Sequence, residues 1–181
     1  SDFKVMLKDE TQPTPQDPSE NVALGQKGYA SSTETSDFTA DKAFDGDTSS
    51  RTSRWSSNVG NPPHWLYVDL GQQRDVKTVR LFWETRKATN YEIQISDDAQ
   101  KWTTVKTMSE RPASKTETIT LDSVKKARYV RLYINASDAQ DPDGDIVWNS
   151  ISVYEMEVYG ALQAEAPVIT PVSGTYSGEQ K

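Results

Sequence analysis

Oxygen-bearing side chains are concentrated in one short stretch, KAFDGD at residues 42–47, which is followed by the hydroxyl-rich SSRTS at residues 49–53. In a tight loop of this composition, the carboxylates of Asp45 and Asp47, the nearby hydroxyls and the backbone carbonyls can converge on one point. Hard oxygen ligands of this kind are those that Ca²⁺ prefers. The stretch therefore predicts a calcium site, and the alternative is a plain Asp-Gly turn.

Neither Asp-rich stretch of the chain fits an EF-hand loop. Counting from Asp45, the position of the EF-hand glutamate is occupied by Ser56, and in DPDGD at residues 141–145 the next residue is Ile146 rather than the required glycine. We interpret DPDGD as a turn.

Glu155 and Glu157 raise the alternative of an enzyme. Two residues apart on a strand, their carboxylates would point to the same face roughly 7 Å apart, within the range of an inverting glycosidase pair. A carboxylate that binds a cation cannot also titrate as a catalytic acid, and a small sandwich suggests no deep cleft. We therefore expect an accessory module without catalytic activity.

Other reactive side chains are scarce, which excludes most catalytic and metal sites. The chain has no cysteine and a single histidine, His64. Disulfide scaffolds, thiolate zinc sites and cysteine nucleophiles are therefore excluded, as are sites that need two imidazoles. A Ser-His-Asp triad would depend on His64 alone.

Length and charge narrow the classes of protein further. A chain of 181 residues is long enough for one domain with a real core. It has no apolar run near the length of a membrane span, and its N-terminus lacks the pattern of a signal peptide. The formal net charge of -7 argues against a nucleic-acid partner, which would require clustered lysine and arginine.

The composition divides the chain into three parts. Residues 1–20 carry Pro13, Pro15 and Pro18 among polar residues, which is typical of an interdomain linker. Residues 21–160 hold all five tryptophans, so we expect the domain there. Residues 161–181 are interpreted as a linker or as the start of a following module. We therefore expect this chain to be part of a larger, multi-domain protein.

Apolar residues within 21–160 alternate with a period of two, which predicts strands rather than helices. In HWLYVDLG, Leu66, Val68 and Leu70 fall on one face of the strand. The same alternation runs through DVKTVRLFWE, NYEIQIS, ETITL, ARYVRLYIN and ISVYEMEVYG. Short strands separated by turn residues, with no helices between them, favour an antiparallel sandwich or barrel.

Eight phrases of this region together resemble the discoidin family, also called the coagulation factor V/VIII type C domain. In the order of that family they are NVALGQKGYASS, KAFDGD, SRWSS, HWLYVDLG, VRLFWE, YEIQISDDAQKW, ARYVRLYI and YEMEVYG. They look most like the family 32 carbohydrate-binding modules of bacterial glycoside hydrolases. The resemblance covers residues 21–160 and implies an all-β fold, an eight-stranded jelly-roll-like antiparallel β-sandwich. Two departures are Ala99, where such modules usually carry glycine, and a short insertion before Trp55.

The resemblance also implies a structural Ca²⁺ that ties the KAFDGD loop to the last strand. In the loop, the resemblance implies the carboxylate of Asp45 and the backbone carbonyls of Lys42 and Asp47 as ligands. A hydroxyl residue would also bind, and the insertion leaves open whether it is Ser50 or Ser53. The last strand would contribute the carbonyl of Met156 and the carboxylate of Glu157.

Sugar sites need an aromatic face that stacks on a pyranose ring and a few fixed donors and acceptors, held on loops by a rigid scaffold. By resemblance, our first choices for contact with a sugar are Glu34, Glu84 and Trp148, with Arg86 as a donor. The further candidates on the same loops are Asn58, His64, Asn90 and Asn149. For His64 the alternative is a structural hydrogen bond, and for Trp148 it is a cap over the core.

The expected function is that of a non-catalytic carbohydrate-binding module that holds a secreted glycoside hydrolase at terminal sugars of glycans, of the galactose, N-acetylgalactosamine or N-acetylglucosamine type. The alternative is a discoidin-type adhesion module that binds a protein or lipid surface. The loops SSTETSD, SNVGNPP and DAQDPDGD are polar and acidic, which argues against a membrane partner. We expect the isolated module to be a monomer and to act outside the cell.

Overall fold

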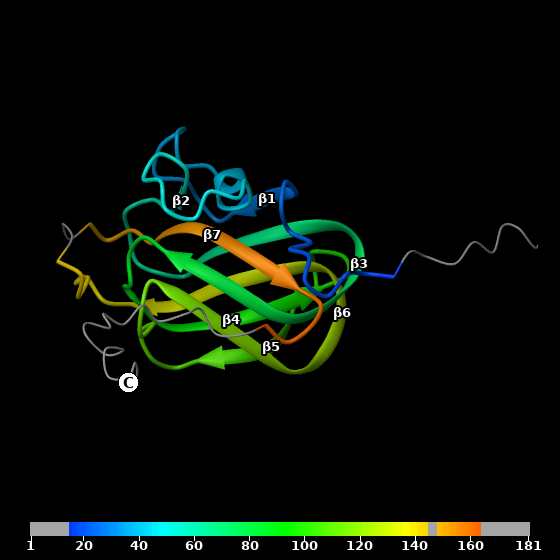
Figure 1. The fold of residues 1–181 in the computed structure, drawn as a ribbon. Helices are drawn as coiled ribbons and strands as arrows, with labels where there is room; N and C mark the ends of the chain where they lie inside the picture. The colour runs from blue at the N-terminus through cyan, green and yellow to red at the C-terminus, as the bar shows by residue number, and fades with distance from the viewer. Residues whose placement is uncertain (1–14, 145–147, 164–181) are drawn as a thin grey trace, which may run out of the picture.

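The chain folds into an antiparallel β-structure in which strands and turns position every candidate residue (Figure 1). The computed structural model describes residues 15–144 and 148–163, and within these ranges it contains seven strands and one 3₁₀ turn. They are β1 (Lys27–Ala30), η1 (Ala40–Ala43), β2 (Trp55–Ser56), β3 (His64–Trp83), β4 (Ala88–Ser96), β5 (Thr103–Met108), β6 (Thr116–Ser137) and β7 (Ser152–Tyr159). In the described part of the chain, no helix has the length and apolar character needed to cross a membrane.

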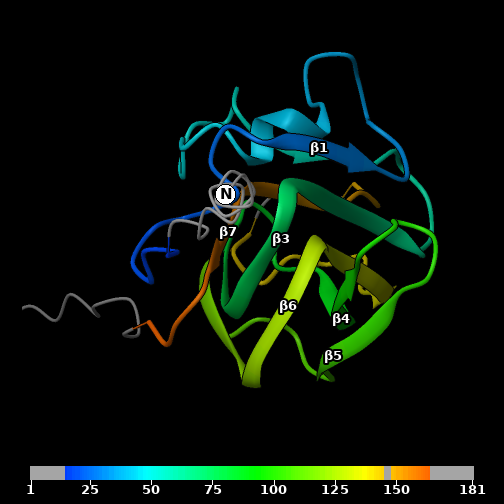
Figure 2. The same cartoon turned by 90° about the vertical axis from the view of Figure 1, so that its right-hand side faces the viewer.

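The two longest strands, β3 and β6, run through both layers of the fold. They pair with each other along three stretches, residues 64–69 with 129–134, residues 74–76 with 125–127 and residues 78–82 with 116–120, and the register shifts between them. The first stretch is flanked by β1 and by β4 with β5, and the last by β7 with β2. Figure 2 shows both strands curving between the two layers.

The predicted all-β sandwich is confirmed, while its strand count differs from the expectation. The phrases HWLYVDLG and DVKTVRLFWE, whose patterns predict two separate strands, are the two halves of β3, and ETITL and ARYVRLYIN are the halves of β6. Bulges in the pairing let each strand bend without ending. The described residues therefore form seven continuous strands rather than eight.

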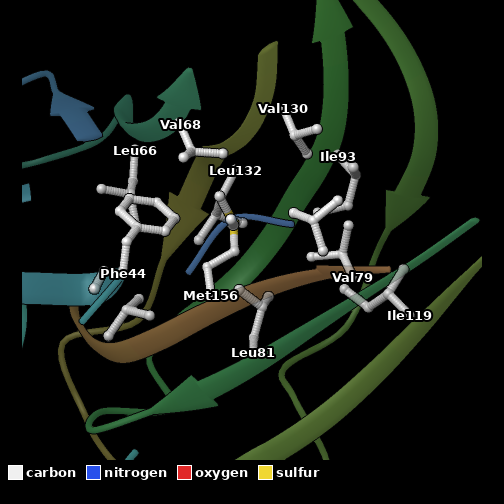
Figure 3. Close-up of a cluster of buried hydrophobic side chains, with 14 of the residues drawn as sticks. Phe44, Leu66, Val68, Val79, Leu81, Ile93, Ile119, Val130, Leu132 and Met156 are labelled. Carbon is white, nitrogen blue, oxygen red and sulfur yellow. The ribbon is translucent and has the colours of Figure 1, made fainter. Parts of the chain in front are cut away.

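The hydrophobic core lies between the two layers, as the alternation predicts. Leu66 and Val68 from the first half of β3 and Val79 and Leu81 from its second half are all fully buried in one cluster (Figure 3). Because both halves of one strand contribute to the same core, burial of these side chains fixes the two layers against each other.

The expected N-terminal linker is partly in contact with the domain. The Gln16 side chain donates to the Asp75 carbonyl (2.9 Å) and accepts from the Asp75 N–H (2.8 Å), at the bend of β3. Gln163 in turn donates to the carbonyl of Pro18. The remaining parts of the predicted tails, residues 1–14 and 164–181, lie outside the described residues.

The hairpin between β4 and β5 contains the alanine that replaces a glycine of the family pattern. Ala99 has a φ of 59°, a conformation that costs about 1 kcal/mol or more for any residue with a Cβ. We therefore predict that Ala99→Gly raises the free energy of unfolding by up to about 1 kcal/mol, measured by urea denaturation. Ala113→Gly, an exposed loop alanine without positive φ, is the control and should lower stability slightly.

Candidate functional site

A cavity of about 320 Å³ opens at the end of the sandwich where β3 ends and β7 begins. Three segments that are distant in sequence form its wall: the stretch before β2, the turn between β3 and β4, and the residues leading into β7. Its lining residues are Glu34, Arg51, Arg54, Glu84, Thr85, Lys87, Gly144, Trp148, Ser150 and Ser152. The cavity thus combines two carboxylates, three cations, three hydroxyls and an indole.

Glu84 is a fixed charged acceptor in this wall. The residue is only 5 % exposed, and its N–H donates to the carbonyl of Ser152 at 3.0 Å, which holds the turn against β7. Its Oε1 lies 3.8 Å from Nε of Arg54. The Arg54 guanidinium is itself held over the ring of Phe38, 3.9 Å from its centroid, and donates to Ser56 Oγ at 3.0 Å. Burial and this ion pair together restrict the Glu84 carboxylate to the cavity wall.

Glu34 and Trp148 complete the part of the site that faces solvent. The backbone of Glu34 is anchored by its N–H, which donates to Ser56 O at 2.8 Å. Its half-buried carboxylate forms no hydrogen bond or ion pair with another described residue. Trp148 is 57 % exposed, so its indole is a platform at the cavity and not a cap over the core. The structure therefore brings together the three first-choice residues Glu34, Glu84 and Trp148.

Three other predicted contacts lie at or beside the loops of the sandwich, but their side chains form hydrogen bonds that stabilise those loops. The ring of His64 is 3 % exposed and its Nε2 is 2.9 Å from the carbonyl of Gly60, so the histidine fixes its own loop. Asn58 accepts from Ser32 Oγ at 2.9 Å. Asn149 Nδ2 donates at 3.0 Å to Oδ1 of Asn61, in the loop that precedes β3. None of the three lines the cavity.

Arg86 and Asn90 also lie outside the cavity, and here the predicted donor role of Arg86 is not what the geometry supports. The Arg86 guanidinium donates to both carboxylate oxygens of Asp143, at 2.8 and 3.0 Å, behind the cavity wall. This hydrogen-bonded pair raises the pKa of Arg86 and lowers that of Asp143. Asn90 accepts from Asn135 at 3.0 Å on the face of the sheet. Of the turn residues, Glu84, Thr85 and Lys87 line the cavity, whereas Arg86 does not, because its side chain is paired with Asp143.

Sequence reasoning missed the cationic part of the site. Arg51 lies in the loop that carries the insertion before Trp55, and Arg54 belongs to the family phrase SRWSS. The insertion was a signal that new side chains enter there. Lys87 is 1 % exposed although it stands beside another basic residue in a polar turn. The adjacent residues Arg86 and Lys87 do not by themselves indicate which of the two side chains faces the cavity.

The expected calcium loop is brought against β7, with Glu155 as the carboxylate that meets it. Glu155 is fully buried, and its Oε2 accepts from the N–H of Gly46 at 2.7 Å. Its Oε1 is buried without a hydrogen-bond partner. Burial, together with the neighbouring carboxylates of Asp45 and Glu157, raises the pKa of Glu155 to about 9, although the Gly46 N–H acts in the opposite direction. Ser53 Oγ donates to Asp45 Oδ2 in the same cluster.

Of the other predicted ligands, Glu157 is not the carboxylate that meets the loop. Lys42, Asp47 and Met156 are expected to bind through backbone carbonyls, so the contacts of their side chains do not decide that role. Glu157 lies two residues along the same face and accepts from the hydroxyl of Tyr159 at 2.7 Å, beyond the covering loop. Asp47 Oδ1 accepts from two backbone N–H groups of its own turn, and Ser50 Oγ pairs with a neighbouring threonine hydroxyl. The Lys42 ammonium contacts the carbonyl of that threonine, and the side chain of Met156 lies in the core. Of the two hydroxyls, Ser53 is the one beside Asp45.

The cluster contains too few carboxylates to hold a cation alone. Within residues 15–144 and 148–163, no three Asp, Glu or His side chains come close enough to bind a metal ion. Asp45 and Glu155 would therefore need hydroxyl, carbonyl or water oxygens to complete a shell, which is usual for Ca²⁺. The pair Glu155 and Glu157 is also no glycosidase dyad, since Glu155 is buried under the loop and neither residue lines the cavity.

Comparison with solved structures places these features in a known group. The chain is 37 % identical to chitosan-binding module 1 of a chitosanase/glucanase from Paenibacillus sp. IK-5, with a TM-score of 0.66 over 78 % of this chain and 99 % of that one. Module 2 of the same enzyme, solved in complex with chitotriose, is 33 % identical, with a TM-score of 0.66 over 77 % and 100 % of the two chains.

More distant structures share the fold alone. A Clostridium perfringens module solved with GalNAc-β-1,3-galactose is 18 % identical, with a TM-score of 0.62 over 75 % of this chain and 95 % of that one. A family model, described as F5/F8 type C, NedA-like, galactose-binding domain, matches residues 42–132, the stretch from the KAFDGD motif to the second half of β6. The chain belongs to the F5/F8 type C family of NedA-like, galactose-binding domains.

Proposed function

We propose that this chain is a non-catalytic carbohydrate-binding module that holds a sugar in the cavity beside Trp148. The observation that carries the proposal is the exposed indole next to Glu34 and the immobilised Glu84. An aromatic face with a few fixed polar groups is the arrangement that recognises a sugar ring and its hydroxyls. The cavity volume of about 320 Å³ is at the small end for ligand pockets, which suits a terminal sugar or a short oligosaccharide.

Among the sugars, we propose an amino sugar of the glucosamine type as the first candidate. Both Paenibacillus modules that are more than 30 % identical to this chain are described as chitosan-binding. Chitosan carries amino groups that take up a proton in water, and the Glu34 carboxylate, which has no ion pair among the described residues, can form a charge-assisted hydrogen bond with such a group. Galactose, N-acetylgalactosamine and N-acetylglucosamine are the competing ligands of the test.

A structural Ca²⁺ at the Asp45–Glu155 cluster forms the second part of the proposal. The residues present fit such an ion, because Glu155 Oε1 is a buried oxygen without a partner and the Asp45 carboxylate and Ser53 hydroxyl adjoin it. When bound, the ion would supply positive charge that neutralises the two carboxylates. The covering loop would thereby be fixed to β7.

The proposed module acts outside the cell as a monomeric part of a multi-domain glycoside hydrolase. Support for this comes from the Paenibacillus modules, which derive from a chitosanase/glucanase. In such a protein, the module would keep the catalytic domain at its polysaccharide by raising the local concentration of substrate.

Isothermal titration calorimetry with a glucosamine trimer tests the proposed function. We expect saturable binding, and Glu34→Gln should weaken the Kd about tenfold because a charge-assisted hydrogen bond becomes a neutral one. The N-acetylated trimer and galactose, run in parallel, should bind more weakly. The control is Glu110→Gln, which makes the same charge change at an exposed site outside the cavity.

Absence of heat with every sugar of this set would reject the sugar proposal. Binding to liposomes in a sedimentation assay would then favour the adhesion alternative, whereas the polar cavity predicts none. An equal loss of affinity in Glu34→Gln and Glu110→Gln would show that only overall charge matters.

A further inference from the structure

Two arginines hold the cavity wall from behind without facing the cavity. The Arg86 guanidinium bridges two segments, since it donates to both carboxylate oxygens of Asp143 and, through Nη1, to the carbonyls of Pro112 (2.7 Å) and Ala113 (3.2 Å). The Arg86 and Asp143 side chains are 15 % and 27 % exposed. This pair is therefore partly removed from water, which strengthens it relative to a surface ion pair.

Arg111 repeats this arrangement from the opposite side of the same segment. Its Nη1 donates to the carbonyls of Arg86 at 2.7 Å and of Gln140 at 2.8 Å, and its Nη2 donates to Asp138 Oδ2 at 2.7 Å. The two guanidiniums thus connect the turn after β3, the loop before β6 and the segment 138–144 after β6. A planar group with several fixed donors can satisfy such a set of acceptors at once, whereas a lysine ammonium on a flexible stem cannot.

The held segment leads directly to the cavity. Asp141 is 6 % exposed, and its carboxylate accepts from the N–H groups of Arg86 (3.2 Å) and Asp143 (2.9 Å). The N–H of Gly144 then donates to the carbonyl of Asp141 at 3.1 Å, and Gly144, with a φ of 84°, lines the cavity. The course of the chain is therefore fixed up to the cavity wall.

Asn149, the residue after Trp148, belongs to a separate network. The N–H of Gly60 donates to the carbonyl of Asn149 at 2.6 Å, and Asn149 Nδ2 donates to Asn61 Oδ1. The two arginines therefore act on the Gly144 side of the cavity.

We propose that Arg86 and Arg111 are positioning residues of the sugar site, which preorganise the Gly144 wall of the cavity through the segment 138–144. This inference rests on the proposed function for its effect on sugar affinity. Without the two guanidiniums, a sugar would have to order this segment on binding, and that cost would appear as lost affinity.

The test compares Arg86→Lys, Asp143→Asn and the double variant. Each single change should weaken the Kd for the glucosamine trimer about tenfold, and the double variant should be little weaker than either, because both changes remove the same contact. The matched control is Arg128→Lys. Arg128 makes a similar two-bond pair with Asp69, at 2.8 and 2.9 Å, away from the cavity.

A second readout separates this inference from the sugar proposal. Hydrogen exchange of the Asp143 and Gly144 amides, which donate to Asp141, should become faster in Arg86→Lys and stay unchanged in Arg128→Lys. Unchanged exchange and an unchanged Kd in Arg86→Lys would overturn the inference. Faster exchange in a protein that binds none of the sugars would support the positioning role and reject only the sugar function.

Discussion

Saturation with Ca²⁺ is expected to stabilise the module strongly against unfolding. At a free concentration 100 times its Kd, an ion that binds only the folded state adds about 2.7 kcal/mol to the free energy of unfolding. For a domain of this size, the melting temperature should rise by about 5–10 °C. The physical reason is the pair of adjoining carboxylates, Asp45 and Glu155, because the cation would offset their mutual repulsion and the burial of Glu155. Differential scanning calorimetry of protein first stripped with chelator measures the effect.

Glu155→Gln and Glu157→Gln distinguish the carboxylate that the structure places at the loop from the one that the resemblance implied. Glutamine at 155 can still accept the Gly46 N–H, so the variant should fold in chelator much as the parent does but should gain no stability from Ca²⁺. Glu157→Gln should keep the full response, because Glu157 contacts Tyr159 instead. An undiminished calcium response in Glu155→Gln, or none in the parent protein, would contradict the proposed site.

Replacement of Trp148 by alanine is expected to cause the largest loss of sugar binding. A well-placed aromatic residue at the centre of a binding site typically contributes about 2 kcal/mol or more, which corresponds to a roughly 30-fold weaker Kd. Because Trp148 is 57 % exposed, its removal leaves no cavity in the core, and the melting temperature should stay within about 1 °C. Titration calorimetry and a thermal melt on the same sample measure both quantities.

Trp148→Tyr provides the matched control, because it retains a flat aromatic ring. This variant should bind more tightly than Trp148→Ala and more weakly than the parent. If alanine at this position leaves the Kd for every sugar unchanged, the platform is not part of the site. A large drop in melting temperature would show instead that the indole is a structural cap.

Local pattern is sufficient to predict the strands because alternation reflects a physical requirement. A strand of a sandwich buries every second side chain, so the alternation by itself assigns Leu66, Val68 and Leu81 to the core. The same pattern does not show that β3 continues through its bend, because the register shifts between Asp69 and Thr78 depend on pairing with β6. Strand identity is therefore predictable from the sequence, and strand continuity is not.

Within the candidate site, the sequence predicted some of the residues that line the cavity but not the direction of every side chain. The resemblance chose Glu34, Glu84 and Trp148, which line one cavity. It assigned Arg86 to the sugar, whereas a carboxylate 57 residues away, Asp143, draws that side chain behind the wall. No local pattern contains this information, since a turn exposes both of its basic residues equally until a distant segment packs against it.

The cluster of Asp45, Ser53 and Glu155 shows the same division at the scale of a single strand. From the sequence alone, an acidic loop and two glutamates on one face of the last strand were evident, and with them the type of ligand that could bind. Which glutamate meets the loop depends on where the segment before β2 crosses β7. In the structure the N–H of Gly46 in that segment donates to Glu155. The sequence by itself determined the strands, the core and the chemical character of the sites, because these follow from side-chain types and short-range periodicity. Only the tertiary structure decided which members of equivalent pairs, Glu155 or Glu157 and Arg86 or Lys87, face their sites, because that choice depends on contacts between distant segments.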